Sequence, residues 1–82
     1  MLQQNNTPLF TTKDLYISAL CYAKGMKLER IEREGRVCWF VFVDKKRGEQ
    51  LQQDFITKTV EVNAKDYSDA LRTLKDLLFA HG

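Results

Sequence analysis

The residues best suited to chemistry lie in the middle of the chain, where basic side chains surround the single tryptophan, Trp39. Residues 24–47 contain eight basic and four acidic residues, a net charge of +4, whereas the rest of the chain has a net charge of −2. Basic side chains beside an exposed aromatic ring can contact phosphates and stack on bases. The candidate nucleic-acid-binding residues are Arg30, Arg33, Arg36, Trp39, Lys45, Lys46 and Arg47.

The same charges also have a simpler interpretation as a solvated surface. Four carboxylates are interleaved with the basic residues, and the net charge of the whole chain is only +2. Arg30 and Trp39 could form a cross-strand cation–π pair that needs no ligand. No set of side chains suggests a base-reading code, so we expect weak specificity for any nucleic acid or nucleoprotein complex that is bound.

The chain contains few side chains that are suited to catalysis. The only histidine, His81, is the penultimate residue, where a general base would be poorly held. Asp14 and Asp66 lie at helix starts, where a capping role explains them, and Cys38 lacks an identifiable base. No glycine-rich phosphate loop, metal triad or nucleophile elbow occurs. We therefore expect a protein that is not an enzyme, with no catalytic residues, metal, cofactor or small-molecule substrate.

The cysteines and the N-terminus favour a cytoplasmic protein. Cys21 and Cys38 lie 17 residues apart without a Cys-x-x-Cys pair, which predicts buried, reduced thiols. The first residues lack the basic and apolar regions of a secretory signal. The longest apolar-rich stretch near the N-terminus, residues 15–23, is far shorter than the ~20 residues that span a bilayer.

Residues 10–82 must form one domain to hold these side chains, and residues 1–9 are expected to be a flexible N-terminal arm. Thr11 is predicted as the N-cap of a first helix, with Asp14 completing a capping box. Gly25 has the position of a glycine that ends this helix.

A β-hairpin is predicted in the middle of the chain. Residues 37–43 are seven successive apolar residues rich in β-branched and aromatic types, which is typical of a largely buried strand. Residues 27–33 are amphipathic and precede a turn that contains Gly35. The hairpin places most of the candidate basic residues on or beside two antiparallel strands.

The register of the hairpin stays open at this stage. A two-residue loop at Glu34 and Gly35 would place Ile31 opposite Cys38 and Arg30 opposite Trp39. A three-residue loop with a bulge would shift these pairs.

Two helices are expected after the hairpin. Asp44 is a plausible N-cap for residues 45–56, and Asn63 for a last helix whose apolar residues follow the 3.6-residue period. Residues 57–62 are β-prone and could add a short third strand at the sheet edge. The predicted fold class is therefore α+β: a helix, an antiparallel β-hairpin and two helices packed on the sheet. The expected core is Leu15, Ala19, Leu20, Ile31, Cys38, Phe40, Phe42, Leu51, Phe55, Leu71, Leu74 and Leu78.

Five short motifs carry a resemblance to a known family: Phe10-x-Thr12-x-Asp14-Leu15, Ala23-Lys24-Gly25, Glu32-Arg33-Glu34-Gly35, Phe40-Val41-Phe42-x-Asp44, and Val62-Asn63-Ala64 leading to Ala70-x-x-x-Leu74-Lys75-x-Leu77. Across about residues 10–79, the chain resembles short bacterial and phage proteins catalogued only as a domain of unknown function. The resemblance implies a compact α+β unit and no particular catalytic or binding residue. This chain has Val43 where family members often have a polar residue.

Two functions remain open from the sequence. The first is a small accessory protein of bacterial or mobile-element origin that binds nucleic acid or a nucleoprotein complex through its hairpin. The second is a protein-directed adaptor or inhibitor without nucleic-acid contact. Trp39, Val41 and Val43 lie on the second face of the hairpin, which we expect another chain to cover, as in a homodimer. Basic residues gathered on one surface would favour the first function, and scattered charges beside an apolar sheet face would favour the second.

Overall fold

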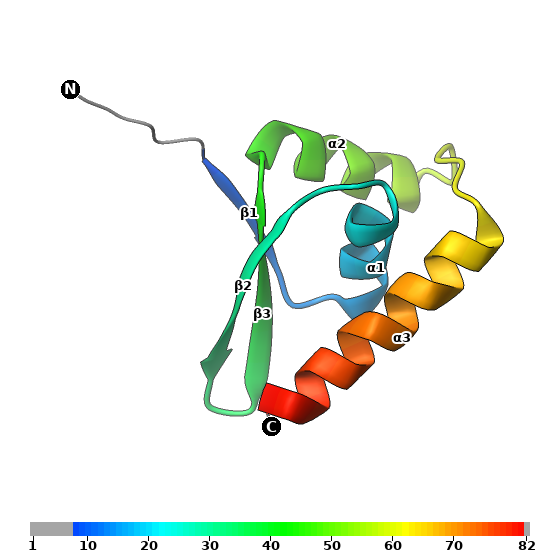
Figure 1. The fold of residues 1–82 in the computed structure, drawn as a ribbon. Helices are drawn as coiled ribbons and strands as arrows, with labels where there is room; N and C mark the ends of the chain where they lie inside the picture. The colour runs from blue at the N-terminus through cyan, green and yellow to red at the C-terminus, as the bar shows by residue number, and fades with distance from the viewer. Residues whose placement is uncertain (1–7, 82) are drawn as a thin grey trace.

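The computed structural model describes residues 8–81, which form an α+β fold (Figure 1). The predicted fold class is confirmed. Three strands and three helices follow one another in the order β1 (Leu9–Thr12), α1 (Leu15–Ala23), β2 (Leu28–Glu34), β3 (Val37–Val43), α2 (Lys45–Ile56) and α3 (Ala64–His81).

The three strands form one antiparallel sheet in the order β1-β3-β2, so the apolar strand β3 lies at the centre. All three helices lie on the same side of the sheet (Figure 1). Helix α2 packs beside β1, and α3 packs mainly along α1. The sheet therefore has an inner face that meets the helices and an outer face that no described helix covers.

The core lies between the inner face of the sheet and the helices. Phe40, Phe42, Leu20 and Leu74 are almost completely buried there, as predicted. Other expected core residues, such as Leu15, Ile31 and Phe55, are half-buried and pack around this centre. Cys38 is only half-buried, which corrects its prediction as a buried thiol. Cys21 is buried, as predicted. Buried residues outside the expected core are Phe10, Ile17, Met26 and Ala70.

The start of the first helix differs from the prediction. Asp14 is itself the N-cap, because its carboxylate Oδ1 accepts hydrogen bonds from the backbone N–H groups of Tyr16 at 2.8 Å and Ile17 at 3.0 Å. Thr11 is not the N-cap but part of β1, where pairing with β3 places Phe10 beside Phe42. The tertiary pairing prevails over the local capping pattern. Residues 1–7 of the expected arm lie outside the described residues, and Leu9 already belongs to β1.

The hairpin has a two-residue turn at Gly35 and Arg36, one residue later than predicted. Gly35 has a positive φ of 63°, as glycine commonly has in such turns. The register is therefore Ile31 opposite Phe40 rather than Cys38. A bulge between Leu28 and Arg30 shifts the far end of β2.

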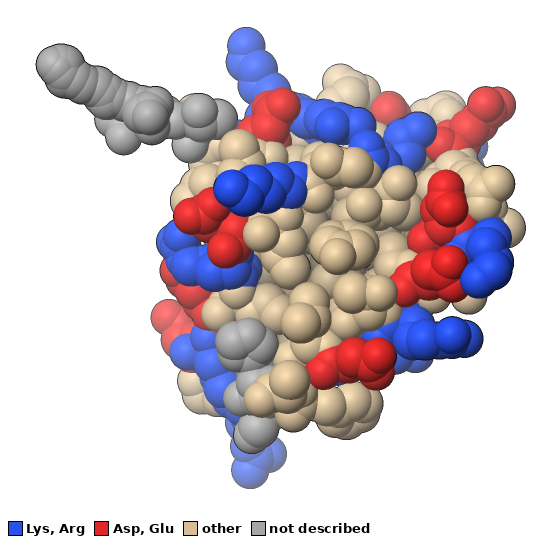
Figure 2. Space-filling view, viewed as in Figure 1, with Lys and Arg blue, Asp and Glu red and all other residues tan. Residues whose placement is uncertain are grey.

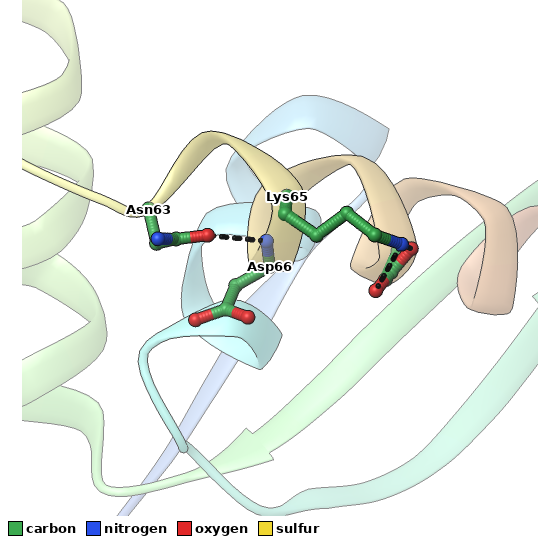
Figure 3. Close-up of polar contacts among 4 residues, drawn as sticks. Asn63, Lys65 and Asp66 are labelled. Atoms are coloured by element: carbon green, nitrogen blue, oxygen red, sulfur yellow. Dashed lines mark hydrogen bonds and ion pairs between the residues drawn. The ribbon is translucent and has the colours of Figure 1, made fainter.

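The last two helices begin where predicted. Asp44 caps α2 by accepting a hydrogen bond from the backbone N–H of Arg47 at 3.2 Å. Asn63 caps α3 by accepting one from the backbone N–H of Asp66 at 3.0 Å (Figure 3). Residues 57–62 form a connection and not the expected edge strand. The third strand of the sheet comes instead from β1, at the other end of the chain.

Candidate functional site

The outer face of the sheet is the most extensive feature that the core does not explain. Side chains alternate between the two faces of a strand, so the inward positions of Phe10, Phe40 and Phe42 place their neighbours outward. The outer face consists of Leu9, Thr11 and Lys13 on the β1 side, Val37, Trp39, Val41 and Val43 on β3, and Arg30, Glu32 and Glu34 on β2.

Trp39 lies between a cation and an anion on this outer face. The ammonium group of Lys13 lies 6.0 Å from the centroid of the Trp39 ring, a cation–π distance. On the other side of Trp39, its partner in β2 is Glu32. Of the registers left open by the sequence, the one with Arg30 opposite Trp39 does not occur, because Arg30 lies opposite Val41. The strands thus carry positive charge on one side of the tryptophan and negative charge on the other.

The apolar part of the outer face is already partly covered within the chain. Val41 is only 1% exposed, and Trp39 and Val43 are half-buried. Leu9 and Val37, at opposite ends of the stripe, are each 36% exposed. Long side chains such as that of Arg30 can lay their methylene groups over neighbouring apolar atoms. The outer face thus combines an apolar centre with charged residues around it, and its apolar side chains are less exposed than the sequence suggested.

The predicted binding residues do not gather on one surface. Arg33 and Arg36 lie at the hairpin tip, where Arg33 Nε donates to the Gly35 carbonyl oxygen at 3.2 Å. Lys45 and Lys46 begin α2, at the opposite end of β3, which is roughly 20 Å long at about 3.3 Å per residue. Figure 2, which views the sheet close to its edge, shows basic and acidic side chains intermixed around the outline of the molecule.

Arg30 lies alone among these cations in the middle of the outer face. Its Nε contacts Glu32 Oε2 at 2.5 Å, and both side chains are about half exposed. This ion pair balances the charge of Arg30 where the side chain lies. Together, the outer face holds two cations, Lys13 and Arg30, and two anions, Glu32 and Glu34.

Arg47 has a structural position on the helix side of the molecule. Its guanidinium donates to the Lys24 carbonyl oxygen at 2.5 Å, at the end of α1. The Lys24 ammonium in turn donates to the Glu61 carbonyl oxygen at 3.1 Å, just before α3. These bonds tie the ends of three helices together beside an open hollow of about 720 Å³ near Asn63 and Asp66. Arg47 is thus explained without a ligand.

Both edges of the sheet are poorly suited to pairing with another strand. Strand β2 exposes Glu29, Arg30, Glu32 and Arg33 and contains a bulge, while β1 is only four residues long. Charged, bulged or short edge strands resist the addition of a further strand. An interaction surface on the sheet is therefore its outer face and not its edges.

Two titratable side chains among the described residues have raised pKa values. Burial raises the pKa of the Cys21 thiol to about 11, the opposite of what a nucleophile needs. Burial, with smaller effects of Asp14 and Tyr16, also raises the pKa of Tyr67, whose hydroxyl donates to the Tyr16 carbonyl oxygen at 3.1 Å. Among the described side chains, which exclude that of His81, no cluster of three potential metal ligands occurs.

The side chain of His81 lies outside the described part of the chain. None of the helices described is both long and apolar enough to cross a membrane.

Sequence reasoning missed Lys13 and Glu32 as site residues. Lys13 reaches Trp39 only because β1 lies beside β3, and β1 was not recognised. The available signal was the apolar and β-branched run Leu9-Phe10-Thr11-Thr12 before the helix. Glu32 would have followed from the correct hairpin register.

A family model described as "Domain of unknown function (DUF5659)" matches residues 7–80. No curated protein and no solved structure matches the chain. The description of the family names no activity or ligand, so function has to be argued from the geometry.

Proposed function

The chain belongs to the DUF5659 family, and we propose that it is a small non-enzymatic accessory protein, an adaptor or inhibitor, that acts by protein–protein association through its outer sheet face. The observation that carries the proposal is this face itself, which no described helix covers: Trp39 and Val43 are half-buried at its centre, and Leu9 and Val37 at its ends are each 36% exposed. A surface with an apolar, aromatic centre and a charged rim is typical of protein interfaces.

The charge distribution supports a protein partner over a nucleic acid. A phosphate backbone is bound by several cations that act together. On the outer face the cations and anions balance, and the Arg30 charge is paired with Glu32. The remaining candidate cations are divided between the hairpin tip and the start of α2. Scattered charges beside an apolar face match the second of the two functions considered from the sequence.

The test compares matched changes on and off the outer face. Val37→Lys adds a charge to an apolar residue of the outer face that is 36% exposed, and Ile56→Lys does the same at the end of α2, where Ile56 is 61% exposed. Each variant and the parent are immobilised and exposed to a nuclease-treated extract of the source organism. We expect the parent and Ile56→Lys to retain the same protein and Val37→Lys to lose it. Equal capture by both variants would contradict the proposal, as would the absence of both heterologous capture and self-association through this face.

Nucleic-acid binding is the second candidate, and one observation favours it. The Trp39 ring lies half-buried on the outer sheet face, with the Lys13 ammonium 6.0 Å from its centroid. An aromatic ring and a cation on a sheet can stack with a base and contact a phosphate. On the same face, Arg30 of β2 lies beside Val41, on the side of Val41 away from β1. Titration with labelled DNA and RNA separates this candidate from the first.

A further inference from the structure

We infer that the partner of the outer face is a second copy of this chain, packed sheet against sheet about a two-fold axis parallel to β3. This inference rests on the proposed function and names its partner. It comes from the order of side chains across Trp39, where Lys13 lies on the β1 side and Glu32 on the β2 side. The β2 side also holds Arg30, which pairs with Glu32, but Glu34 leaves that side with a net negative charge. The outer face is therefore electrically asymmetric across its central strand.

A two-fold axis parallel to β3 exchanges the two sides of the face. When two such faces meet, the β1 side of one copy lies over the β2 side of the other. Lys13 of each copy then lies opposite Glu32 of the other, which forms two intermolecular ion pairs, and Trp39 meets Trp39. A two-fold interface repeats every contact twice, so one favourable pair counts double. Aligned packing at about −30° and ~10 Å is common for stacked sheets.

An in-plane axis perpendicular to the strands gives the opposite result. It leaves each side of the face opposite itself, so that Lys13 approaches Lys13 and Glu32 approaches Glu32. Like charges in contact disfavour that arrangement. The order of charges around Trp39 thus favours the arrangement with the two-fold axis parallel to β3 over the arrangement with the axis perpendicular to the strands.

The size of the face predicts the strength of the dimer. Two strands of seven residues and one of four, ~4.8 Å apart and rising about 3.3 Å per residue, present a face of roughly 285 Å². Stable complexes bury about 800 Å² on each partner, so this dimer is expected to be weak. Measurements must therefore extend from micromolar to near-millimolar protein.

The experiment exchanges the two charges and measures mass by sedimentation equilibrium. Lys13→Glu alone places two glutamates against each other at both pairs, and Glu32→Lys alone places two lysines there. We expect each single variant to raise the dissociation constant roughly tenfold. Mixing the two variants should restore association, because the mixed dimer again pairs glutamate with lysine at both positions. Lys46→Glu and Glu49→Lys make the same charge changes on exposed residues of α2 and should leave the mass unchanged.

Several outcomes overturn the inference. The first is a protein that stays monomeric at every concentration. The second is a dimer whose dissociation constant is unchanged by Lys13→Glu and Glu32→Lys. The third is a mixture of the two single variants that associates no better than each variant alone. These outcomes contradict the dimer without contradicting the proposed function. A monomer that still captures another protein, and loses it with Val37→Lys, would keep that function with a different partner. Far-UV circular dichroism of each variant verifies that the fold is retained.

Discussion

A side chain at Gly48 would collide with Phe10: a Cβ atom there would overlap the Phe10 ring carbon Cγ and its Cβ. Gly48 lies in the first turn of α2, and Phe10 lies in β1. The helix therefore contacts the strand at the one position that lacks a side chain. This contact explains a glycine that is otherwise unfavourable inside a helix.

We expect Gly48→Ala to destabilise the protein. Alanine gains about 1 kcal/mol of helix propensity, but forcing a methyl group into a packed contact typically costs 1–3 kcal/mol or more. The clash prevails because Phe10 is held by its pairing with Phe42. Urea unfolding measures the net loss of stability. Adding Phe10→Ala should cost less in the Gly48→Ala background than in the parent; equal costs would show that the contact is absent.

The helix starts show why part of the fold was predictable. Asn63 and Asp44 cap their helices through hydrogen bonds to backbone groups three residues away, and Gly25 ends α1 within its own turn. Helix caps of this kind can be predicted from a few neighbouring residues of the sequence. Strand β1 is different, because its pairing with β3 spans about thirty residues and outweighs a plausible capping box at Thr11.

The candidate site was less predictable than the fold, because it depends on two non-local facts. Lys13 reaches Trp39 through the placement of β1, and Glu32 reaches it through the hairpin register. An apolar strand predicts that Trp39 and Val41 share a face, but not which charges lie beside them. The candidate basic residues are exposed, and their separation along β3 follows only from the turn at Gly35.

We expect Phe40→Ala to lower the free energy of unfolding by about 3–5 kcal/mol. Phe40 is 1% exposed at the centre of the core. A loss of this size is comparable to the stability of a small domain. Val37→Ala, at a residue of the same strand that is 36% exposed, should cost only about 0.5 kcal/mol. Similar melting temperatures for Phe40→Ala and the parent would contradict this description of the core.

Lys58→Gly should stabilise the protein by about 0.5–1 kcal/mol. Lys58 has a φ of 62° after α2, where its N–H donates to the Phe55 carbonyl oxygen and that of Thr59 to the Asp54 carbonyl oxygen. These bonds form a helix end that favours glycine. Lys58→Ala, which removes the charge but keeps the strained φ, should bring no gain in thermal unfolding. An equal gain for alanine would assign the effect to charge.

Stability should fall between pH 9 and 11 because of Cys21. Burial raises the pKa of its thiol from 9.0 to about 11. Above pH 9 the unfolded thiol releases its proton while the folded thiol keeps it, so rising pH favours the unfolded state. The contribution is at most about 1.4 kcal/mol per pH unit. Cys21→Ala should have a flatter pH dependence in urea unfolding than the parent; identical slopes would contradict the buried thiol.

We expect labelled single- and double-stranded DNA and RNA to show no saturable binding at tens of micromolar protein and low salt. The physical reason is the division of the cations: Arg33 and Arg36 lie at one end of β3, and Lys45 and Lys46 at the other. If about four of them instead act together on phosphates, affinity should fall roughly as the third to fourth power of salt concentration. Removal of Lys45 and Lys46 should then lower that slope by about two. Salt-dependent binding of this kind that is also lost in the Trp39→Thr variant would favour nucleic-acid binding over protein association. Binding that is insensitive to salt and to these residues would support neither function.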